Sequence, residues 1–233
     1  MKIISLEGNI GSGKEQFIEF FKKYFTDELL FLDDSLYTWE NENFFKKFYK
    51  DPERWSFTLE VYSTIQKYQK LLKVDENFNK VVITRRSPVS NRECFVKTCK
   101  EIGYIDQKEY SIYNEMFNIL NIHKMQGVIY LKSNVNKCYE SILSKNQNKN
   151  INFNFIQKLH NNYELWIECL KKEKIPVLTI NIDNFRDIEG NEQTQEKLLT
   201  LITEKFPCIK ECIKKYRYTN WTKVTRKKKK NAF

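Results

Sequence analysis

Residues 2–16, at the start of the chain, place the strongest constraint on its fold. A short apolar run at residues 3–6 enters a glycine-rich segment at residues 8–14, and an amphipathic pattern follows from Phe17. This order predicts a strand, a loop and a helix. Glycine allows a backbone with positive φ, which turns successive N–H groups inward, and the positive end of the helix dipole points into the same hollow. We therefore expect this segment to bind a chain of phosphates.

The glycine-rich segment has the spacing G-x-x-x-x-G-K, which is typical of loops that hold nucleotide phosphates. We call residues 8–14 the phosphate loop. Lys14 supplies a cation for the β- and γ-phosphates, whereas Glu15 stands where such loops have a serine or threonine that binds Mg²⁺. The alternative is a chance glycine loop before an ordinary helix, which the complete spacing disfavours. The predicted phosphate-binding residues are Gly8, Asn9, Ile10, Gly11, Ser12, Gly13, Lys14 and Glu15.

The length of 233 residues suits one large α/β domain, which is long enough to bury a core of its own. We expect this domain to span residues 1–219 and a basic tail to span residues 220–233. The run at residues 226–230 contributes to the net charge of +10. Such a run can bind nucleic acid, but a solvated terminus is the commoner explanation, and anionic nucleotides suit a positive chain equally well. We therefore do not favour a nucleic-acid partner.

The sequence lacks the features of several other protein classes. No apolar run approaches the length needed to cross a bilayer, and residues 3–6 are too short for the apolar core of a signal peptide. The six cysteines form no C-x-x-C pair, and the two histidines stand outside ligand spacing. We expect an intracellular, cytoplasmic protein without a membrane partner, a zinc site or a catalytic cysteine–histidine pair.

Apolar runs and helical patterns alternate along the rest of the chain. Runs typical of buried strands lie at residues 3–6, 29–32, 81–84, 127–131 and 175–182. Helical patterns lie at residues 41–49, 52–74, 89–102, 107–123, 134–143, 153–172 and 194–206, and the polar residues 144–152 predict a loop between two helices. This alternation predicts an α/β fold with a five-stranded parallel sheet and helices on both faces. Charged residues that follow the second and third strands are expected to face the ligand crevice, and they are Asp33, Asp34, Arg85 and Arg86.

Three further segments together resemble the deoxynucleoside kinase family. The strongest is residues 49–58, YKDPERWSFT, which is close to that family's tyrosine followed by PERWSFT. Residues 85–87 with residues 91–92 resemble the family's E-R-S and D-R, and residues 159–166 are similar to the helix after the family's lid. The resemblance covers residues 1–206. It implies a P-loop kinase fold with a short lid, usually in a homodimer.

Members of this family transfer the γ-phosphoryl group of ATP to the 5′-hydroxyl of a deoxynucleoside. The resemblance therefore implies ATP and Mg²⁺ as cofactors and a deoxynucleoside substrate, as in a deoxycytidine kinase. The implied catalytic residues are Asp34 in the position of the general base, Arg86 at the transferring phosphate, and Lys14. The residues implied to wrap the adenine are Asp183, Asn184 and Phe185. The lid residues that stand in place of the family's arginines are Lys145 and Lys149.

The resemblance also implies a nucleoside pocket. Tyr49 matches the tyrosine that binds the sugar 3′-hydroxyl, and Arg86 matches the arginine at the 5′-oxygen. Trp39 and Phe95 match residues that wall the base, although core packing explains either aromatic equally well. The residues in place of the family's base-reading glutamine, arginine and aspartate are Glu60, Lys67 and Asn91. Because a carboxylate only accepts hydrogen bonds, this set favours a base with N–H donors, unless the carboxylate simply pairs with the lysine.

Two positions near the expected metal site hold a new acid and a new base. Arg85 stands where the family's E-R-S begins with an acid, and Glu15 stands in the serine or threonine position. We hypothesise an ion pair between Glu15 and Arg85, with weak or absent turnover, because a monovalent cation cannot bridge phosphate oxygens as Mg²⁺ does. The alternative is that Glu15 binds Mg²⁺ directly. Two functions stay open: a kinase with altered base preference, and a pseudokinase that serves as a binding or structural protein.

Overall fold

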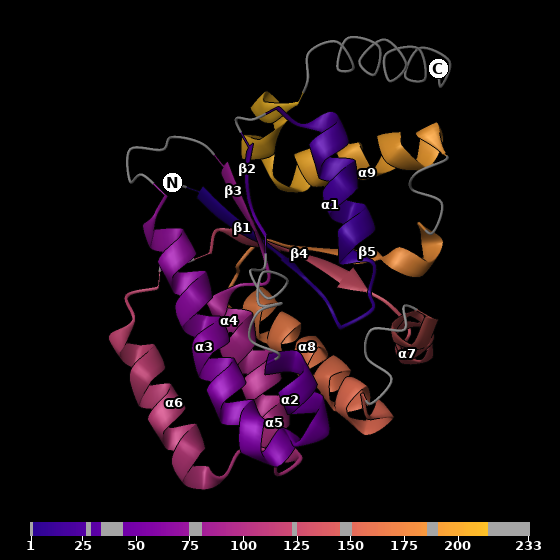
Figure 1. Cartoon of the computed structure of the whole chain (residues 1–233). Helices are drawn as coiled ribbons and strands as arrows, with labels where there is room; N and C mark the ends of the chain where they lie inside the picture. Colours follow the sequence, from indigo (N-terminus) through magenta and orange to yellow (C-terminus); the bar gives the residue numbers. More distant parts are fainter. Residues whose placement is uncertain are drawn as a thin grey trace, which may run out of the picture.

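The computed structural model describes residues 2–26, 29–33, 44–74, 81–122, 125–144, 151–185 and 191–213. Figure 1 shows a central sheet with helices on both sides. Several residues singled out in the sequence lie outside the described ranges, and they are Asp34, Trp39, Lys145, Lys149 and the tail at 220–233. The domain boundary at residue 219 therefore stays a prediction.

Five parallel strands form the sheet. They are β1 (Lys2–Glu7), β2 (Leu29–Leu32), β3 (Val81–Arg85), β4 (Gly127–Lys132) and β5 (Val177–Asn181). The strand order is β2-β3-β1-β4-β5, and every neighbouring pair is parallel. This confirms the predicted α/β fold with its five-stranded parallel sheet. Because β1 pairs with both β3 and β4, the segments that follow these three strands emerge at one edge of the sheet.

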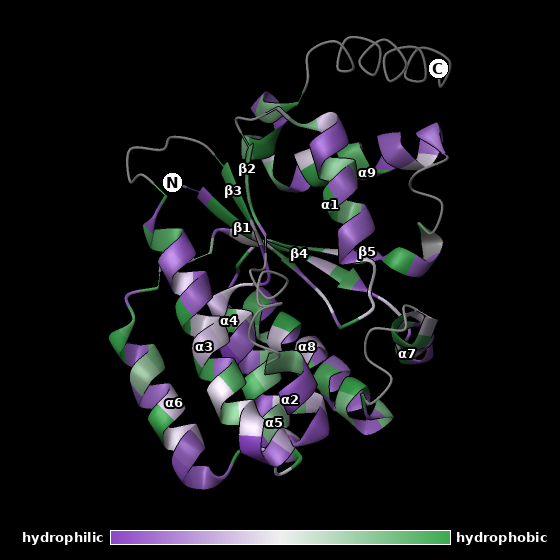
Figure 2. Ribbon diagram, viewed as in Figure 1, coloured by the Kyte–Doolittle hydropathy of each residue, from purple (hydrophilic) through white to green (hydrophobic). Residues whose placement is uncertain are grey.

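Helices cover both faces of the sheet, because successive side chains of a strand point to opposite sides. Ile4 and Leu6 of β1 belong to one apolar cluster with residues of α1 (Lys14–Tyr24) and α9 (Glu192–Lys205). A second cluster joins Val128 of β4 to α6 (Gln107–Ile119) and α8 (Phe153–Lys172). Figure 1 shows α1 and α9 on one side of the sheet and α8 on the other, and Figure 2 shows apolar residues concentrated in the strands.

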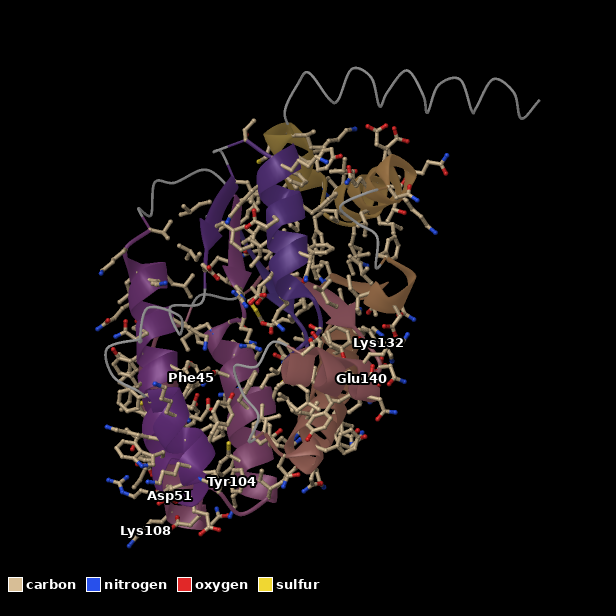
Figure 3. The ribbon with its side chains drawn as sticks, turned by 45° about the vertical axis from the view of Figure 1, so that its right-hand side comes forward. Phe45, Asp51, Tyr104, Lys108, Lys132 and Glu140 are labelled. Carbon is tan, nitrogen blue, oxygen red and sulfur yellow. The ribbon has the colours of Figure 1, made fainter. Side chains whose placement is uncertain are left out.

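The second face also carries α2 (Phe44–Lys50) and α3 (Pro52–Leu72). Asp51, labelled in Figure 3, begins α3: its side chain accepts a hydrogen bond of 3.1 Å from the Arg54 backbone N–H. Pro52 takes the first helical position, where its missing N–H costs nothing. The predicted start of this helix is therefore confirmed.

The helix predicted at residues 89–102 is more complex than its apolar pattern indicates. It consists of α4 (Pro88–Ser90), a π-helical segment η2 (Asn91–Val96) and α5 (Lys97–Glu101). A π-helical turn has one more residue per hydrogen-bonded ring than an α-helical turn, and such turns occur frequently at functional sites. Two predicted substrate-binding residues, Asn91 and Phe95, lie on this segment.

Several other element ends differ from their predicted positions. The fifth strand is shorter than residues 175–182, because Ile182–Asn184 form a 3₁₀ turn, η3, and Pro176 has no N–H to donate. The helix α6 ends at Ile119, not at residue 123. The helix after β4 is α7 (Val135–Ser144), and Pro207–Cys212 form a last 3₁₀ helix, η4. Among the described helices, none combines the length and apolar character needed to cross a bilayer.

Candidate active site

The phosphate loop connects β1 to α1 and has the backbone that its glycines predict. Gly8, Gly11 and Gly13 have φ values of 149°, 78° and 80°. Gly13 is the N-cap of α1, so the first turn of this helix directs its N–H groups toward the loop. A Cβ at Gly11 would lie 2.3 Å from the Cys138 carbonyl oxygen. The loop therefore needs glycine both for its conformation and for its close contact with α7.

Lys14, the predicted phosphate-binding cation, is buried at the start of α1. Its ammonium donates hydrogen bonds to the carbonyl oxygens of Gly8 (2.8 Å) and Asn9 (2.6 Å), and to the hydroxyl of Ser12 (3.2 Å). Burial, reinforced by the positive charges of Arg86 and Arg85, holds the pKa of Lys14 well below its usual value. The lysine is thus held inside its own loop, at the point where a bound phosphate would meet it.

Asn9 fastens the phosphate loop to the second face of the sheet. Its side-chain amide donates to the Ile156 carbonyl oxygen on α8 at 3.0 Å, and its side-chain oxygen accepts from the Ile10 N–H at 2.8 Å. Because α8 follows the predicted lid residues in the chain, this contact connects the loop to the helix that comes after them. Asn9 therefore has a structural task that its sequence position alone does not reveal.

Arg85 ends β3 and has its side chain almost fully buried. Its guanidinium lies 3.3 Å from the Glu15 carboxylate and 3.2 Å from the Asp33 carboxylate. The ion pair that the sequence predicted between Glu15 and Arg85 is confirmed. The contact to Asp33 was not predicted: Asp33 directly follows β2, the strand that neighbours β3, but Asp34 does so almost equally.

Arg86, predicted to act at the transferring phosphate, has an unusual backbone conformation. Its φ is 59°, which is uncommon for a residue with a side chain. Its N–H donates to the Leu6 carbonyl oxygen at 3.0 Å, and its guanidinium lies 4.9 Å from the centre of the Phe95 ring. The structure thus brings Arg86 together with Phe95, one of the residues implied to wall the base.

Glu7, at the end of β1, is a buried carboxylate that was not predicted as a site residue. It accepts hydrogen bonds from the Ser87 backbone N–H at 2.9 Å and from the Tyr163 hydroxyl at 3.2 Å. Burial raises the pKa of Glu7, while hydrogen bonds from Ser5 and Ser87 oppose the shift. The Glu7 side chain therefore connects three parts of the site: the strand that enters the phosphate loop, the segment after β3, and α8.

The predicted base-reading residues form one buried polar network. The Asn91 side-chain amide donates to Glu60 Oε2 at 2.7 Å and to the Thr64 hydroxyl at 3.0 Å. The Lys67 ammonium donates to Asn91 Oδ1 at 3.1 Å and also to the Ser63 hydroxyl. All of these side chains are buried. Asn91 thus links the carboxylate of Glu60 to the ammonium of Lys67.

The remaining predicted residues lie in less polar surroundings. Tyr49, on α2, packs against Phe48 with ring centres 5.1 Å apart. Phe185 is buried in the apolar cluster that contains α1 and α9. Asp183 forms an ion pair with Lys137 at 3.3 Å and accepts from the Asn134 N–H at 3.3 Å. The side chain of Asn184 lies outside the described residues, as do Asp34, Trp39, Lys145 and Lys149.

The residues around Arg85 provide a test of whether a magnesium ion fits this site. Mg²⁺ is usually held by one or two carboxylates together with phosphate oxygens and water. The described carboxylates at this position, Glu15 and Asp33, already bind the Arg85 guanidinium. Within the described ranges, no three Asp, Glu, His or Cys side chains gather as metal ligands would. These residues fit a fixed monovalent cation and do not fit a divalent ion.

The sheet order, the phosphate loop after β1 and the cationic side chains at the same sheet edge define a P-loop kinase fold. A sequence model of deoxynucleoside kinases matches residues 4–208. The chain therefore belongs to the deoxynucleoside kinase family.

Individual relatives agree with this assignment. A protein of fowlpox virus, named a probable deoxycytidine kinase, is 30% identical over 201 residues, covering 83% of this chain and 84% of the relative. The mitochondrial deoxyguanosine kinase of Xenopus laevis is 27% identical and covers 85% and 87% of the two chains. Deoxycytidine kinase 1 of the same frog is 27% identical, and the alignment covers 88% of this chain and 90% of the relative.

Proposed function

We propose that this protein transfers the γ-phosphoryl group of ATP to the 5′-hydroxyl of a deoxynucleoside. The supporting observation is that Lys14, at the start of α1, and Arg86, directly after β3, lie close together: after burial, the charge of Arg86 is the largest cause that lowers the pKa of Lys14. Phosphoryl transfer depends mainly on positioning and on stabilising the charge of the transferring group. A buried lysine and a nearby arginine supply both at the end of β1 and β3.

The proposal gives each group a task. The N–H groups of the phosphate loop and Lys14 hold the ATP phosphates, while Arg86 stabilises the charge that develops on the transferring group. Asp34 accepts the proton of the 5′-hydroxyl, and Tyr49 positions the sugar. We propose that residues 183–185 contact the adenine, and that Lys145 and Lys149 neutralise phosphate charge from the lid.

The buried network around Asn91 supports a proposal about the base. Glu60 can only accept hydrogen bonds while ionised, and Lys67 can only donate them. A base that enters this pocket would therefore present N–H donors toward Glu60. We propose a preference for bases with an exocyclic amino group, and the fowlpox and Xenopus relatives named for deoxycytidine agree with this choice.

A second candidate function is a pseudokinase that binds nucleotides without transferring phosphate. The observation that favours it is the Arg85 guanidinium between Glu15 and Asp33, because these residues do not fit a divalent ion. Such a protein would keep the phosphate loop and the nucleoside pocket, and it would act through binding or through its structure.

A transfer assay distinguishes the two functions. The purified protein is incubated with ATP labelled at the γ-phosphate and with each of the four common deoxynucleosides, and labelled monophosphate is measured. We expect product with deoxycytidine, and a loss of about a thousandfold in Arg86→Gln, since arginines at transferring phosphates contribute effects of this order. Nucleotide binding without any transfer would support the pseudokinase. Absence of both binding and transfer would contradict both functions.

We further propose that residues 1–219 act in the cytoplasm as a homodimer. Apolar side chains are exposed on α6 and α8, among them Ile119 and Leu165, and they support the proposal that a second copy covers this surface in solution. The molar mass from light scattering after size-exclusion chromatography tests this proposal. A mass of one chain at micromolar concentration would contradict it.

A further inference from the structure

Glu15 occupies the position at which a phosphate loop usually contacts its metal ion. In such loops the residue after the lysine is a serine or threonine whose hydroxyl binds Mg²⁺. Here Glu15 lies in the first turn of α1, and its side chain is 43% exposed. Its Oε1 lies 3.3 Å from Nη2 of Arg85. The side chain that follows the loop lysine thus contacts a guanidinium of the same protein.

The guanidinium of Arg85 is fixed from two sides. Its Nη1 lies 3.2 Å from Oδ1 of Asp33, the residue that follows β2, while Nη2 faces Glu15 at the start of α1. The Arg85 side chain is only 8% exposed. Because the guanidinium is planar and rigid, contacts through both terminal nitrogens fix its orientation as well as its position. Arg85 therefore contributes a positive charge that cannot diffuse away.

The same small region already contains two other cations. Arg85 and Arg86 are consecutive at the end of β3, and both lie close enough to Lys14 to lower its pKa, although burial is the larger cause. A divalent ion placed beside them would meet three positive side chains, with the carboxylates of Glu15 and Asp33 already bound to Arg85. Electrostatic repulsion in a partly buried site opposes such an ion.

We infer that the Arg85 guanidinium, held by Glu15 and Asp33, stands in place of the divalent ion of a phosphate-loop enzyme, so that this chain binds its nucleotide without metal. The inference rests on the proposed function in requiring that the loop binds a nucleotide. It differs from that function because either a kinase or a pseudokinase can bind in this way. A guanidinium is not removed by a chelator, whereas Mg²⁺ is.

Calorimetry of ADP and ATP binding to the full chain tests the inference. Titrations are run with Mg²⁺ and with EDTA, and the dissociation constants are compared. We expect them to differ by less than about twofold, because removing the metal removes no contact. In EDTA, Arg85→Gln should weaken binding by roughly tenfold to a hundredfold, which is the effect of losing one charged contact.

The variant Glu15→Ser/Arg85→Glu should convert the site to a metal-dependent one. It restores a hydroxyl after the loop lysine and places a carboxylate at the end of β3, near Asp33. We expect its nucleotide affinity to fall in EDTA by about tenfold relative to Mg²⁺, an effect typical of losing one strong contact. With Mn²⁺ as the probe, electron paramagnetic resonance should detect nucleotide-dependent metal binding by this variant and not by the original protein.

Arg92→Gln is the matched control. Arg92 belongs to the segment that follows β3, but its side chain pairs with Glu93 and lies over the Phe117 ring of α6. Its dissociation constants should equal those of the original protein in both buffers. Thermal unfolding of every variant reports whether it is folded.

The outcomes separate this inference from the proposed function. If the original protein binds nucleotide only with Mg²⁺, the inference is wrong and the kinase proposal stands. If Arg85→Gln is folded and binds nucleotide as tightly as the original protein does in EDTA, the proposed role of Arg85 is contradicted. If the original protein binds no nucleotide in either buffer, the proposed function fails, and the inference fails with it.

Discussion

The carboxylate of Glu7 accepts a hydrogen bond of 2.9 Å from the backbone N–H of Ser87, which joins the end of β1 to the segment after β3. Arg86 is the first residue after β3 and has a left-handed backbone with φ of 59°. Such a conformation persists only where the surrounding structure holds it. The bonds from Arg86 N–H to Leu6 and from Ser87 N–H to Glu7 hold it from both sides. Glu7 is therefore a positioning residue for Arg86.

The substitution Glu7→Gln should change how stability depends on pH. Burial raises the pKa of Glu7 above its ordinary value of 4.5, so the native state binds this proton more tightly than the unfolded state. The stability that protonation provides is present in full below the unfolded pKa and is lost as pH rises through the folded pKa. Glutamine does not titrate. We therefore expect the variant to gain stability relative to the original protein as pH rises above about 4.5.

Urea unfolding of the two proteins at a series of pH values from about 4 to about 8 measures this difference. This range extends from the ordinary pKa of a carboxylate to well above it. Because all other titrating groups are shared, their contributions cancel in the comparison. Glu109→Gln, at an exposed capping position of α6, is a carboxylate control outside the site. A constant difference in stability across the series would show that Glu7 has the same pKa in both states.

Arg86→Lys should lower kcat and leave folding almost unchanged. Lysine keeps the charge but lacks the planar fork of the guanidinium, so it cannot hold two phosphate oxygens in one fixed geometry. We expect a decrease in kcat of about a hundredfold to a thousandfold, within the range that arginines contribute to phosphoryl transfer. Steady-state kinetics with ATP and a deoxynucleoside measure it, and the thermal midpoint serves as the folding control. Unchanged kcat with a raised KM would assign Arg86 to ground-state binding.

The sheet and the phosphate loop could be predicted because each depends on local patterns. An apolar run of β-branched residues, a glycine spacing and a helical period all lie within a few residues of one another, as residues 2–16 illustrate. The pair of Glu15 and Arg85 was predictable for a different reason. Both residues occupy positions of known motifs, and an acid is gained at one position while an acid is replaced by a base at the other.

The other site contacts could not be predicted because they join residues far apart in the chain. Glu7 reads as an ordinary residue at the end of a strand, and only the pairing of β1 with β3 brings Ser87 to it. Asp33 and Asp34 are chemically equivalent in the sequence, so their order gave no reason to pair Asp33 with Arg85. The π-helical segment at Asn91–Val96 likewise has the apolar pattern of a regular helix.

Gly11→Ala should destabilise the protein more than Gly103→Ala does. Both glycines have positive φ, of 78° and 83°, so alanine at either position costs about 1–2 kcal/mol of backbone strain. Only at Gly11 would the new Cβ also meet a backbone atom, the Cys138 carbonyl oxygen at 2.3 Å, whereas no described heavy atom lies within 4 Å of a Cβ at Gly103. Chemical unfolding measures both. Equal losses of stability would mean that α7 moves away from the loop without cost.

The same pair of variants should differ in nucleotide binding. Relief of the contact at Gly11 requires the phosphate loop or α7 to move, and either movement displaces the N–H groups that would surround the phosphates. We expect Gly11→Ala to weaken ADP binding by at least about tenfold, corresponding to one lost charged hydrogen bond. Gly103→Ala, between α5 and α6, should bind as the original protein does.

Lys67→Met should expose how strongly the buried network depends on its charges. The Lys67 ammonium donates to Asn91 Oδ1 at 3.1 Å, and Asn91 in turn donates to Glu60 Oε2 at 2.7 Å. Removing the ammonium takes a charged donor away from Asn91 Oδ1 in a buried network, and losing a charged hydrogen bond in such a site typically costs about 1–3 kcal/mol. We expect urea unfolding of this variant to show a loss of that order.

The double variant Glu60→Gln/Lys67→Met should recover part of this loss, because the neutral amide no longer needs a cation. Glutamine keeps an oxygen that can accept from the Asn91 amide, so the hydrogen bond to Asn91 is preserved. A double-mutant cycle from the two single variants and the double variant gives the coupling between Glu60 and Lys67, and we expect about 1–3 kcal/mol. Strictly additive effects would show that Asn91 transmits no interaction between the two charges, and that the network holds them independently.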